Sequence, residues 1–397
     1  MEEMKDSSIF LNQFEVVLPQ YSADQNQICE WVCNNHIQSE QLKVSADGPQ
    51  LNSDFISRLF KKYAIKSDQI SKRYFECADI LNRDTSKASI YKLTEKNPSG
   101  ADIAARAQFF SEQADRVFHI LYKNKINRPH HLIHVTCTGY VSPSAAQRVV
   151  VAPFWDKDKN LGRSTAVTHA YHMGCYAALP AIRMAEGFIY AGKSKQNEFQ
   201  VDLVHNELCG LHMNPQAQNP EQIIVQTLFA DGHIKYSATA TAVGKRNLKV
   251  IAVHEKIVAE SEPDMSWTPA SWGLQMTLSR EVPQKIKQQI RPFLQELLTK
   301  ANMSLSEVKK AKFAIHPGGP KIIASVQEAL ELSDEQTQES KKILFERGNM
   351  SSATLPHVWN EMLASDIPVN TKIVSFAFGP GLTLFGSVFE IVSDGVR

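Results

Sequence analysis

The sequence predicts an α/β protein in which helices cover mostly buried sheets. Short apolar runs that favour strands alternate with longer amphipathic segments along the chain, and this alternation is typical of layered α/β folds. The chain has 397 residues, of which 43% are hydrophobic, enough for two or three domains' worth of core. The 18 Gly and 18 Pro residues exclude collagen-like and low-complexity classes.

The first half of the chain contains both kinds of segment. Amphipathic helices are expected over 51–63 and 103–123, where apolar residues recur near helical spacing. Residues 163–190 are rich in Ala, Ile and Leu and predict one long helix. Strands are expected at the apolar or alternating runs 131–135, 199–205 and 234–243.

The second half repeats the pattern after a weak boundary near 243–249. A strand over 249–258 precedes a predicted loop that contains Trp267 and Trp272. A helix is expected over 284–303, and another begins at Pro320, which a first helical turn accepts. The remaining strands are expected at 311–316, 372–378 and 384–392.

The charge balance excludes several classes of partner. The chain has 43 basic and 42 acidic side chains, so bulk electrostatics does not favour binding to nucleic acid or an anionic membrane. The first residues lack a signal-peptide pattern, and no run of 18 apolar residues predicts a membrane span. Six thinly spread cysteines do not form a disulfide scaffold. We therefore expect a cytoplasmic protein with reduced thiols.

Cys175 is the cysteine with the most distinctive surroundings. It follows Gly174 and precedes an Ala-rich helical pattern, so its sulfur is expected at a helix N-terminus, where the dipole and free N–H groups favour a thiolate of lowered pKa. The alternative is a small hydrophobic residue in a packed helix. Cys29 and Cys33, close to His36, lack the second ligand pair of a zinc site, so no metal is expected. We interpret Cys77, Cys137 and Cys209 as core residues.

A cysteine nucleophile needs a base and a donor for the developing oxyanion, and two downstream residues are candidates. His316 ends a predicted strand and precedes a Pro-Gly-Gly-Pro turn, and the carboxyl ends of strands are where sites form in open α/β layers. Asn349 precedes Ser351 and Ser352, which can cap a helix starting near 353. The alternative for Asn349 is a turn or capping residue.

Several blocks together carry a resemblance to a known family. The strongest are Ile-His-Pro-Gly-Gly-Pro at 315–320, Gly-Asn-Met-Ser-Ser-Ala at 348–353 and Phe-Gly-Pro-Gly-Leu-Thr at 378–383, supported by Gly174-Cys175 and by 226–232. In this order and spacing, the chain resembles a type III polyketide synthase of the chalcone synthase kind, within the thiolase-like condensing enzymes. The match covers roughly residues 55–392.

The resemblance implies a thiolase-like, five-layered αβαβα fold built from two similar halves. The half 1–245 would carry the nucleophilic Cys175, and the half 246–397 the catalytic His316 and Asn349. It also implies a homodimeric acyltransferase without a cofactor. In that mechanism Cys175 takes an acyl group from a thioester, and a malonyl thioester loses carbon dioxide. The enolate, held by His316 and Asn349, then attacks the acyl group, once or repeatedly.

Further positions are implied to bind substrate, and some depart from the family pattern. Phe229 matches an aromatic residue at the mouth of the family's active site, whereas Met276 replaces a second one. Ser67 and Ser71 stand where the family tends to have basic contacts to coenzyme A phosphates. The remaining candidates are the basic residues Lys66, Lys72 and Arg73 and the pocket positions Ser142 and His212.

These departures keep two alternatives open. One is a ketosynthase that depends on an acyl carrier protein and makes a single carbon–carbon bond, since fewer phosphate contacts weaken the case for free coenzyme A thioesters. The other is a catalytically silent homologue that acts as a binding or assembly partner, against which the complete set of three catalytic residues argues. The sequence leaves open the starter acyl group, the number of extensions and the mode of cyclisation.

Overall fold

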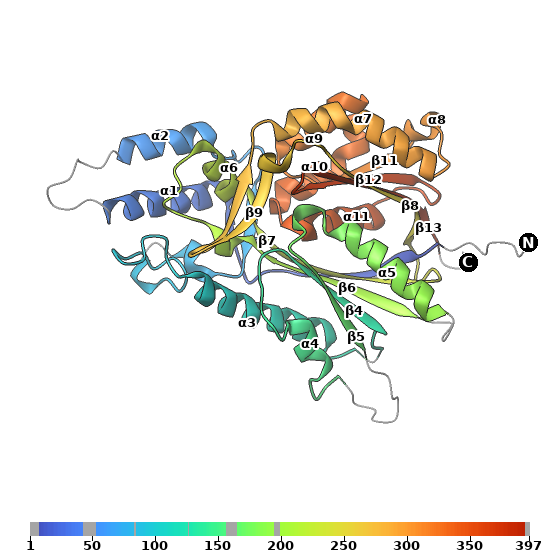
Figure 1. Ribbon diagram of the computed structural model, residues 1–397, viewed down its shortest axis with the longest axis horizontal. Helices are drawn as coiled ribbons and strands as arrows, with labels where there is room; N and C mark the ends of the chain where they lie inside the picture. The colour runs from blue at the N-terminus through green and yellow to red at the C-terminus, as the bar shows by residue number, and fades with distance from the viewer. Residues whose placement is uncertain are drawn as a thin grey trace, which may run out of the picture.

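A nine-stranded sheet forms the centre of the protein, with strand order β11-β12-β13-β8-β1-β7-β6-β4-β5 (Figure 1). The computed structural model describes residues 8–42, 53–82, 85–125, 127–155, 165–193 and 199–393. Within these residues, no helix combines the length and the hydropathy that a membrane crossing requires.

Five strands from the first half form one side of this sheet. β4 runs parallel to β5 and β6, whereas β7 is antiparallel to both β6 and β1. Every residue of β4 and β7 is buried, as expected for strands covered on both faces. The bounds are β1 (Phe10–Val17), β4 (His131–Thr136), β5 (Ala166–Tyr171), β6 (Gln200–Leu208) and β7 (Asp231–Thr239).

Four strands from the second half form the other side. β11 and β12 are parallel, and β13 is antiparallel to both β12 and β8. The two groups join where β1 pairs with β8 through Phe10 and Leu11, next to a bond from the Val250 N–H to the Ile9 carbonyl at 2.9 Å. The division at 245/246 stays a prediction, and this strand order is compatible with it. The bounds are β8 (Asn247–Ile257), β11 (Lys312–Ile315), β12 (Lys372–Gly379) and β13 (Thr383–Val392).

Helices lie between and outside the two groups of strands. α5 (Ala178–Lys193) and α11 (Thr354–Ala364) share one buried apolar cluster with strands of both groups, and therefore form the middle layer (Figure 1). A second cluster packs α1 (Gln25–Gln41) and α3 (Ile103–Tyr122) against the first group. A third packs α7 (Val282–Lys300) and α9 (Pro320–Leu330) against the second group. The predicted five-layered αβαβα arrangement is confirmed.

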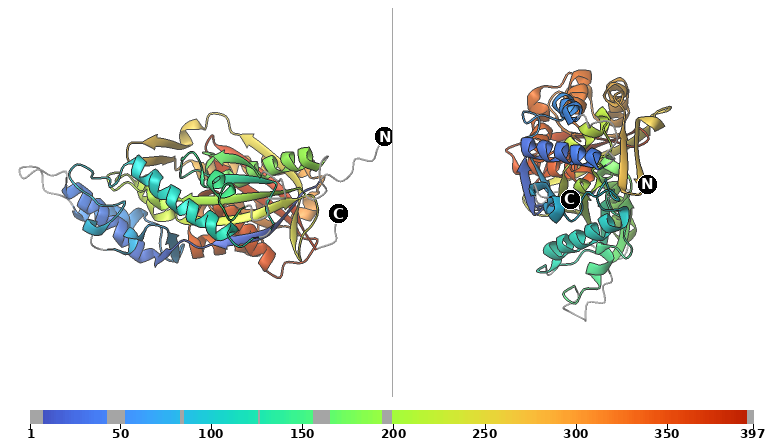
Figure 2. Two further views of the ribbon diagram at one scale, coloured as in Figure 1. Left: turned by 90° about the horizontal axis from the view of Figure 1, so that it is seen from below. Right: turned by 90° about the vertical axis from the view of Figure 1, so that its left-hand side faces the viewer.

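Smaller elements complete the chain. α1 and α2 lie together at one end of the long axis (Figure 2). Two short antiparallel pairs, β2 with β3 and β9 with β10, stand apart from the main sheet. Their bounds are β2 (Tyr21–Asp24), β3 (Lys72–Phe75), β9 (Met265–Ala270) and β10 (Gly273–Leu278); the remaining helices are α2 (Ser53–Tyr63), α4 (Ala145–Val150), α6 (Pro220–Leu228), α8 (Leu305–Val308) and α10 (Asp334–Arg347).

Most predicted elements are present, and two predictions are wrong. The single helix over 163–190 is strand β5, a short turn and then α5. Residues 166–171 pair in parallel with β4, and Gly174 in the turn has φ +74°. The predicted loop around Trp267 is the β9–β10 hairpin. Residues 163–164, like 51–52 of the first predicted helix, lie outside the described residues.

Candidate active site

Cys175 lies in a tight turn between β5 and α5. The turn spans Gly174–Tyr176, and α5 begins at Ala178. Gly174 has φ +74°, and a Cβ atom there would lie 2.8 Å from the Cδ of Pro380, so only glycine fits without strain. The turn therefore packs against the loop that follows β12, and this contact brings a first-half nucleophile against a second-half loop.

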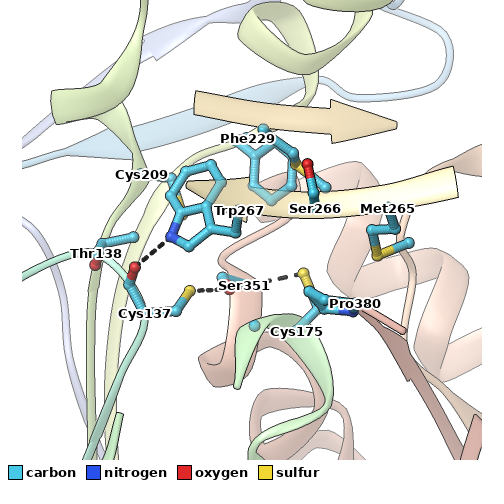
Figure 3. A pocket seen from close by; sticks show the side chains of 12 residues that line it. Cys137, Thr138, Cys175, Cys209, Phe229, Met265, Ser266, Trp267, Ser351 and Pro380 are labelled. Atoms are coloured by element: carbon cyan, nitrogen blue, oxygen red, sulfur yellow. Dashed lines mark hydrogen bonds between the residues drawn. The ribbon is translucent and has the colours of Figure 1, made fainter. Parts of the chain in front are cut away.

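The environment of Cys175 favours the neutral thiol. Burial raises the pKa of Cys175 to about 12; the nearby Ser351 hydroxyl and the Asn349 side chain oppose this rise, and the Glu207 carboxylate adds to it. The sulfur lies 3.6 Å from the Ser351 Oγ (Figure 3). The lowered pKa expected from the sequence is therefore not what the structure shows, because desolvation in an apolar cavity outweighs the helix end.

His316 follows β11 directly, at the carboxyl end of that strand. Its backbone N–H donates to the Phe376 carbonyl of β12 at 2.7 Å, which continues the ladder by one residue. Burial lowers the pKa of His316 to about 3, so the imidazole is neutral near pH 7. Neither ring nitrogen has a hydrogen-bond partner within the described part of the chain, and no hydrogen bond there joins the ring to Cys175.

Asn349 follows α10, next to the glycine that ends the helix. Gly348 has φ +72°, and its backbone lies too close to the Arg73 side chain and the Leu228 carbonyl for a Cβ atom to fit easily. The Asn349 backbone bonds to Leu228 and Ala230 on either side of Phe229. The side chain is 1% exposed, and its Nδ2 has no hydrogen-bond partner among the described residues.

A cavity opens over Cys175 with an empty volume of about 340 Å³, part of it open to solvent. A second cavity of about 350 Å³ adjoins it, and the two share four lining residues: Cys209, Phe229, Trp267 and Met276. The indole N–H of Trp267 donates to the Cys137 carbonyl at 2.5 Å, which fixes the ring in the wall (Figure 3). Met276 pairs directly with Trp267 across the β9–β10 hairpin.

Three of the expected substrate-binding residues line these cavities. Phe229 and Met276 border both, and His212 borders the second. The His212 Nε2 donates to the Thr138 carbonyl at 2.8 Å, and Nδ1 accepts from the Leu274 N–H at 3.1 Å. Burial lowers the pKa of His212 to about 3, so the ring is neutral near pH 7. Both of its nitrogens are hydrogen-bonded, and the ring forms part of the wall of the second cavity.

The other four expected substrate-binding residues lie elsewhere. Ser142 is exposed and lines neither of the two cavities described above. Lys66 is exposed after α2, where its ammonium group bonds to the Lys61 carbonyl, and Lys72 is half-buried on β3. Their predicted contacts with phosphate stay predictions.

Arg73 is corrected by the structure. Its side chain is fully buried and donates to the carbonyls of Gln226 and Phe229, at 3.0 and 2.6 Å, and to Gln25. Because side chains alternate along β3, Arg73 points inward where Lys72 points outward. The guanidinium therefore supports the Phe229 segment and cannot extend to a phosphate at the surface.

Several residues of the site were missed from the sequence. Cys137, expected in the core, lines the Cys175 cavity; its sulfur lies 3.0 Å from the Ser351 Oγ and 3.6 Å from Glu207. It follows the last residue of β4, and its place at a strand's carboxyl end was the available signal. Trp267 was assigned to a loop. No group of three or more His, Cys, Asp or Glu side chains in the described ranges is arranged to hold a metal.

The fold is the thiolase-like fold of solved type III polyketide synthase structures. The C-terminal type III polyketide synthase domain of Steely1, from Dictyostelium, superposes with a TM-score of 0.78 at 20% identity, over 97% of this chain and 99% of that domain. At that identity the superposition establishes the fold. The sequence comparisons add which proteins the chain is similar to.

The family described as "Chalcone and stilbene synthases, C-terminal domain" matches residues 249–393. The alpha-pyrone synthesis polyketide synthase-like Pks18 of Mycobacterium tuberculosis is 28% identical over 269 residues, which are 66% of this chain and 65% of that protein. Type III polyketide synthase B of Arabidopsis thaliana is 25% identical over 87% of each chain. The resemblance found in the sequence is confirmed: the chain is a relative of the type III polyketide synthases.

Proposed function

We propose that the chain catalyses decarboxylative Claisen condensation, extending an acyl group held on Cys175 with malonyl units. The observation that carries the proposal is the set of unpartnered nitrogens on buried His316 and Asn349. Buried donors without partners are costly, and native proteins retain them where a ligand completes them. The polyketide synthase relatives support the same reaction.

The first step is the transfer of the acyl group to Cys175. At neutral pH the thiol and the imidazole are both uncharged, because burial disfavours each charged form. We propose that His316 accepts the thiol proton as the sulfur attacks the thioester carbonyl. The new carbon–sulfur bond forms on Cys175, the old one breaks, and the departing thiolate takes the proton from His316, which restores the neutral ring.

The second step is formation of the carbon–carbon bond. A malonyl thioester binds with its carbonyl oxygen facing Asn349 and His316, and carbon dioxide leaves with the charge passing to that oxygen as an enolate. One such donor contributes about 2.7–4 kcal/mol to stabilising charge that develops in the transition state. The enolate carbon attacks the acyl carbonyl on Cys175, and the sulfur leaves as a thiolate.

We propose acyl- and malonyl-coenzyme A as the substrates. The type III polyketide synthase relatives favour coenzyme A thioesters over the carrier-protein-dependent ketosynthase. A homodimer and a cytoplasmic location are part of the proposal. In support, β5 ends the nine-stranded sheet with an edge that a second copy can cover, and all six cysteines are unpaired.

The test is mass spectrometry of the intact protein after incubation with acyl-coenzyme A or with the matching acyl carrier protein. We expect an adduct on wild-type protein from the coenzyme A thioester, absent from Cys175→Ala, and release of carbon dioxide from malonyl-coenzyme A. Loading only from the carrier protein would support the single-condensation ketosynthase. A chain that neither loads nor decarboxylates would be a silent homologue.

A further inference from the structure

The side-chain amide of Asn349 is held in one of its two orientations. Its Oδ1 accepts a hydrogen bond from the Ser351 N–H at 2.9 Å. A backbone N–H can only donate, so an Asn349 amide turned by 180° would set its own N–H₂ group against that donor. The oxygen therefore faces Ser351, and the nitrogen is the atom left without a partner.

Thr354, the first residue of α11, places its hydroxyl between this oxygen and the Ser351 carbonyl, and its single proton has its nearer acceptor in that carbonyl. Its hydroxyl lies 3.3 Å from the Asn349 Oδ1 and 2.9 Å from the Ser351 carbonyl, and it accepts from the Met350 N–H at 2.8 Å. Thr354 is fully buried, so water does not compete for these bonds. One hydroxyl thus contacts three successive residues of the Asn349 turn.

The turn that Thr354 braces is not one that the backbone adopts readily. Ser351 has φ +49°, a left-handed conformation that non-glycine residues rarely take and that persists only when the surroundings fix it. That conformation accompanies the Ser351 N–H bond to Oδ1. Loosening the turn would therefore loosen the amide of Asn349.

We propose that Thr354 is a positioning residue that keeps the Asn349 Nδ2 directed at the malonyl thioester oxygen. The proposal rests on the proposed function and adds a residue that touches neither substrate nor Cys175. A positioning role of this kind predicts an effect on decarboxylation, which uses Asn349. It predicts a smaller effect on loading of Cys175, where the Ser351 and Asn349 side chains only oppose the larger effect of burial on the pKa of the thiol.

The experiment compares Thr354→Val, which keeps the shape and removes the hydroxyl, with Thr354→Ser, which keeps the hydroxyl. We expect Thr354→Val to lower kcat for malonyl-coenzyme A decarboxylation roughly ten-fold with KM within two-fold, since small misplacements of a catalytic group are costly. Thr354→Ser should stay within about two-fold of wild type, and the rate of Cys175 acylation should fall much less than decarboxylation in Thr354→Val.

Three results would overturn the positioning role: an unchanged kcat in Thr354→Val, an equal fall in decarboxylation and acylation, or failure of Thr354→Ser to restore the rate. A double-variant cycle with Asn349→Ala gives a further check. If Thr354→Val folds poorly, Thr354→Cys takes its place in the cycle. In an Asn349→Ala background the Thr354 change should add nothing, and an additive effect contradicts the proposal. If Asn349→Ala itself decarboxylates at the wild-type rate, the proposed function fails instead.

Discussion

The surroundings of Cys175 differ from those of His316 and Asn349 in how they treat buried polar groups. The thiol is surrounded by apolar side chains and has a hydroxyl 3.6 Å away, and burial keeps it protonated. The nitrogens of His316 and Asn349 are equally buried but have no partner in the described chain. The nucleophile is thus held neutral until substrate arrives, whereas the donors are held unsatisfied for the substrate to complete.

The largest effect is expected when the nucleophile alone is removed. Cys175→Ala should abolish acylation and lower condensation by at least about a thousand-fold, because no other group forms the thioester intermediate. Decarboxylation of malonyl-coenzyme A should continue, since the donors remain. Intact-mass measurement and carbon dioxide release report the two steps separately. Condensation at the wild-type rate would show that the sulfur is not the nucleophile.

Removing one of the donors should have the opposite result, with decarboxylation impaired more than loading. Asn349→Ala should lower the decarboxylation rate by about 10²–10³-fold, the range for loss of one oxyanion donor. Loading of Cys175 should fall much less, because the Asn349 side chain is a smaller influence on the pKa of the thiol than burial. His316→Ala is the matched comparison and should impair both steps, because the imidazole also takes the thiol proton. If loading fell as much as decarboxylation in Asn349→Ala, the role of the nucleophile could not be separated from that of the donors.

The pH dependence of alkylation tests directly whether the Cys175 thiol is neutral at pH 7. With the pKa of Cys175 at about 12, the thiolate fraction rises ten-fold per pH unit throughout the neutral range. Iodoacetamide should therefore modify Cys175 about a hundred-fold faster at pH 9 than at pH 7. Peptide mapping isolates this site from the other five cysteines. A rate that is flat over this range would mean that a thiolate already exists at pH 7.

The smallest expected effect concerns the partition between the two cavities. Trp267→Ala should join them and raise kcat/KM for longer acyl starters about ten-fold relative to short ones, in line with the energy of filling apolar pocket volume. Trp267→Phe keeps most of the ring and loses the bond to the Cys137 carbonyl, so it should keep the wild-type ratio of kcat/KM for long and short starters. Unchanged selectivity in Trp267→Ala would show that the indole does not divide the acyl space.

The catalytic candidates could be selected from the sequence, whereas their electrostatics could not. His316 and Asn349 stand in short blocks whose order and spacing along the chain carry the resemblance to the type III polyketide synthases. The protonation of Cys175 depends on what covers it, and the covering side chains come from the β9–β10 hairpin and the loop after β12. The residues next to Cys175 in the sequence do not show which distant segments cover it, so they do not predict its desolvation.

Local patterns also failed where tertiary contacts decide the outcome. Arg73 belongs to a basic segment, but its position on β3 turns it inward, where three hydrogen-bonded groups offset the cost of its burial. The first part of the predicted 163–190 helix contains a strand, because pairing with β4 outweighs helix propensity there. In contrast, strands β4 and β12 contain short runs rich in apolar residues and were found directly.

The backbone bridge between Phe229 and Asn349 has a consequence for redesign of this chain. Phe229 shapes the space available to a growing chain, and Asn349 is proposed to stabilise charge; yet the two share neighbouring main-chain hydrogen bonds. A substitution that shifts the Phe229 segment to admit a bulkier guest would also displace the Asn349 amide. Capacity and rate are therefore coupled at this bridge, and a variant selected for one should be screened for the other.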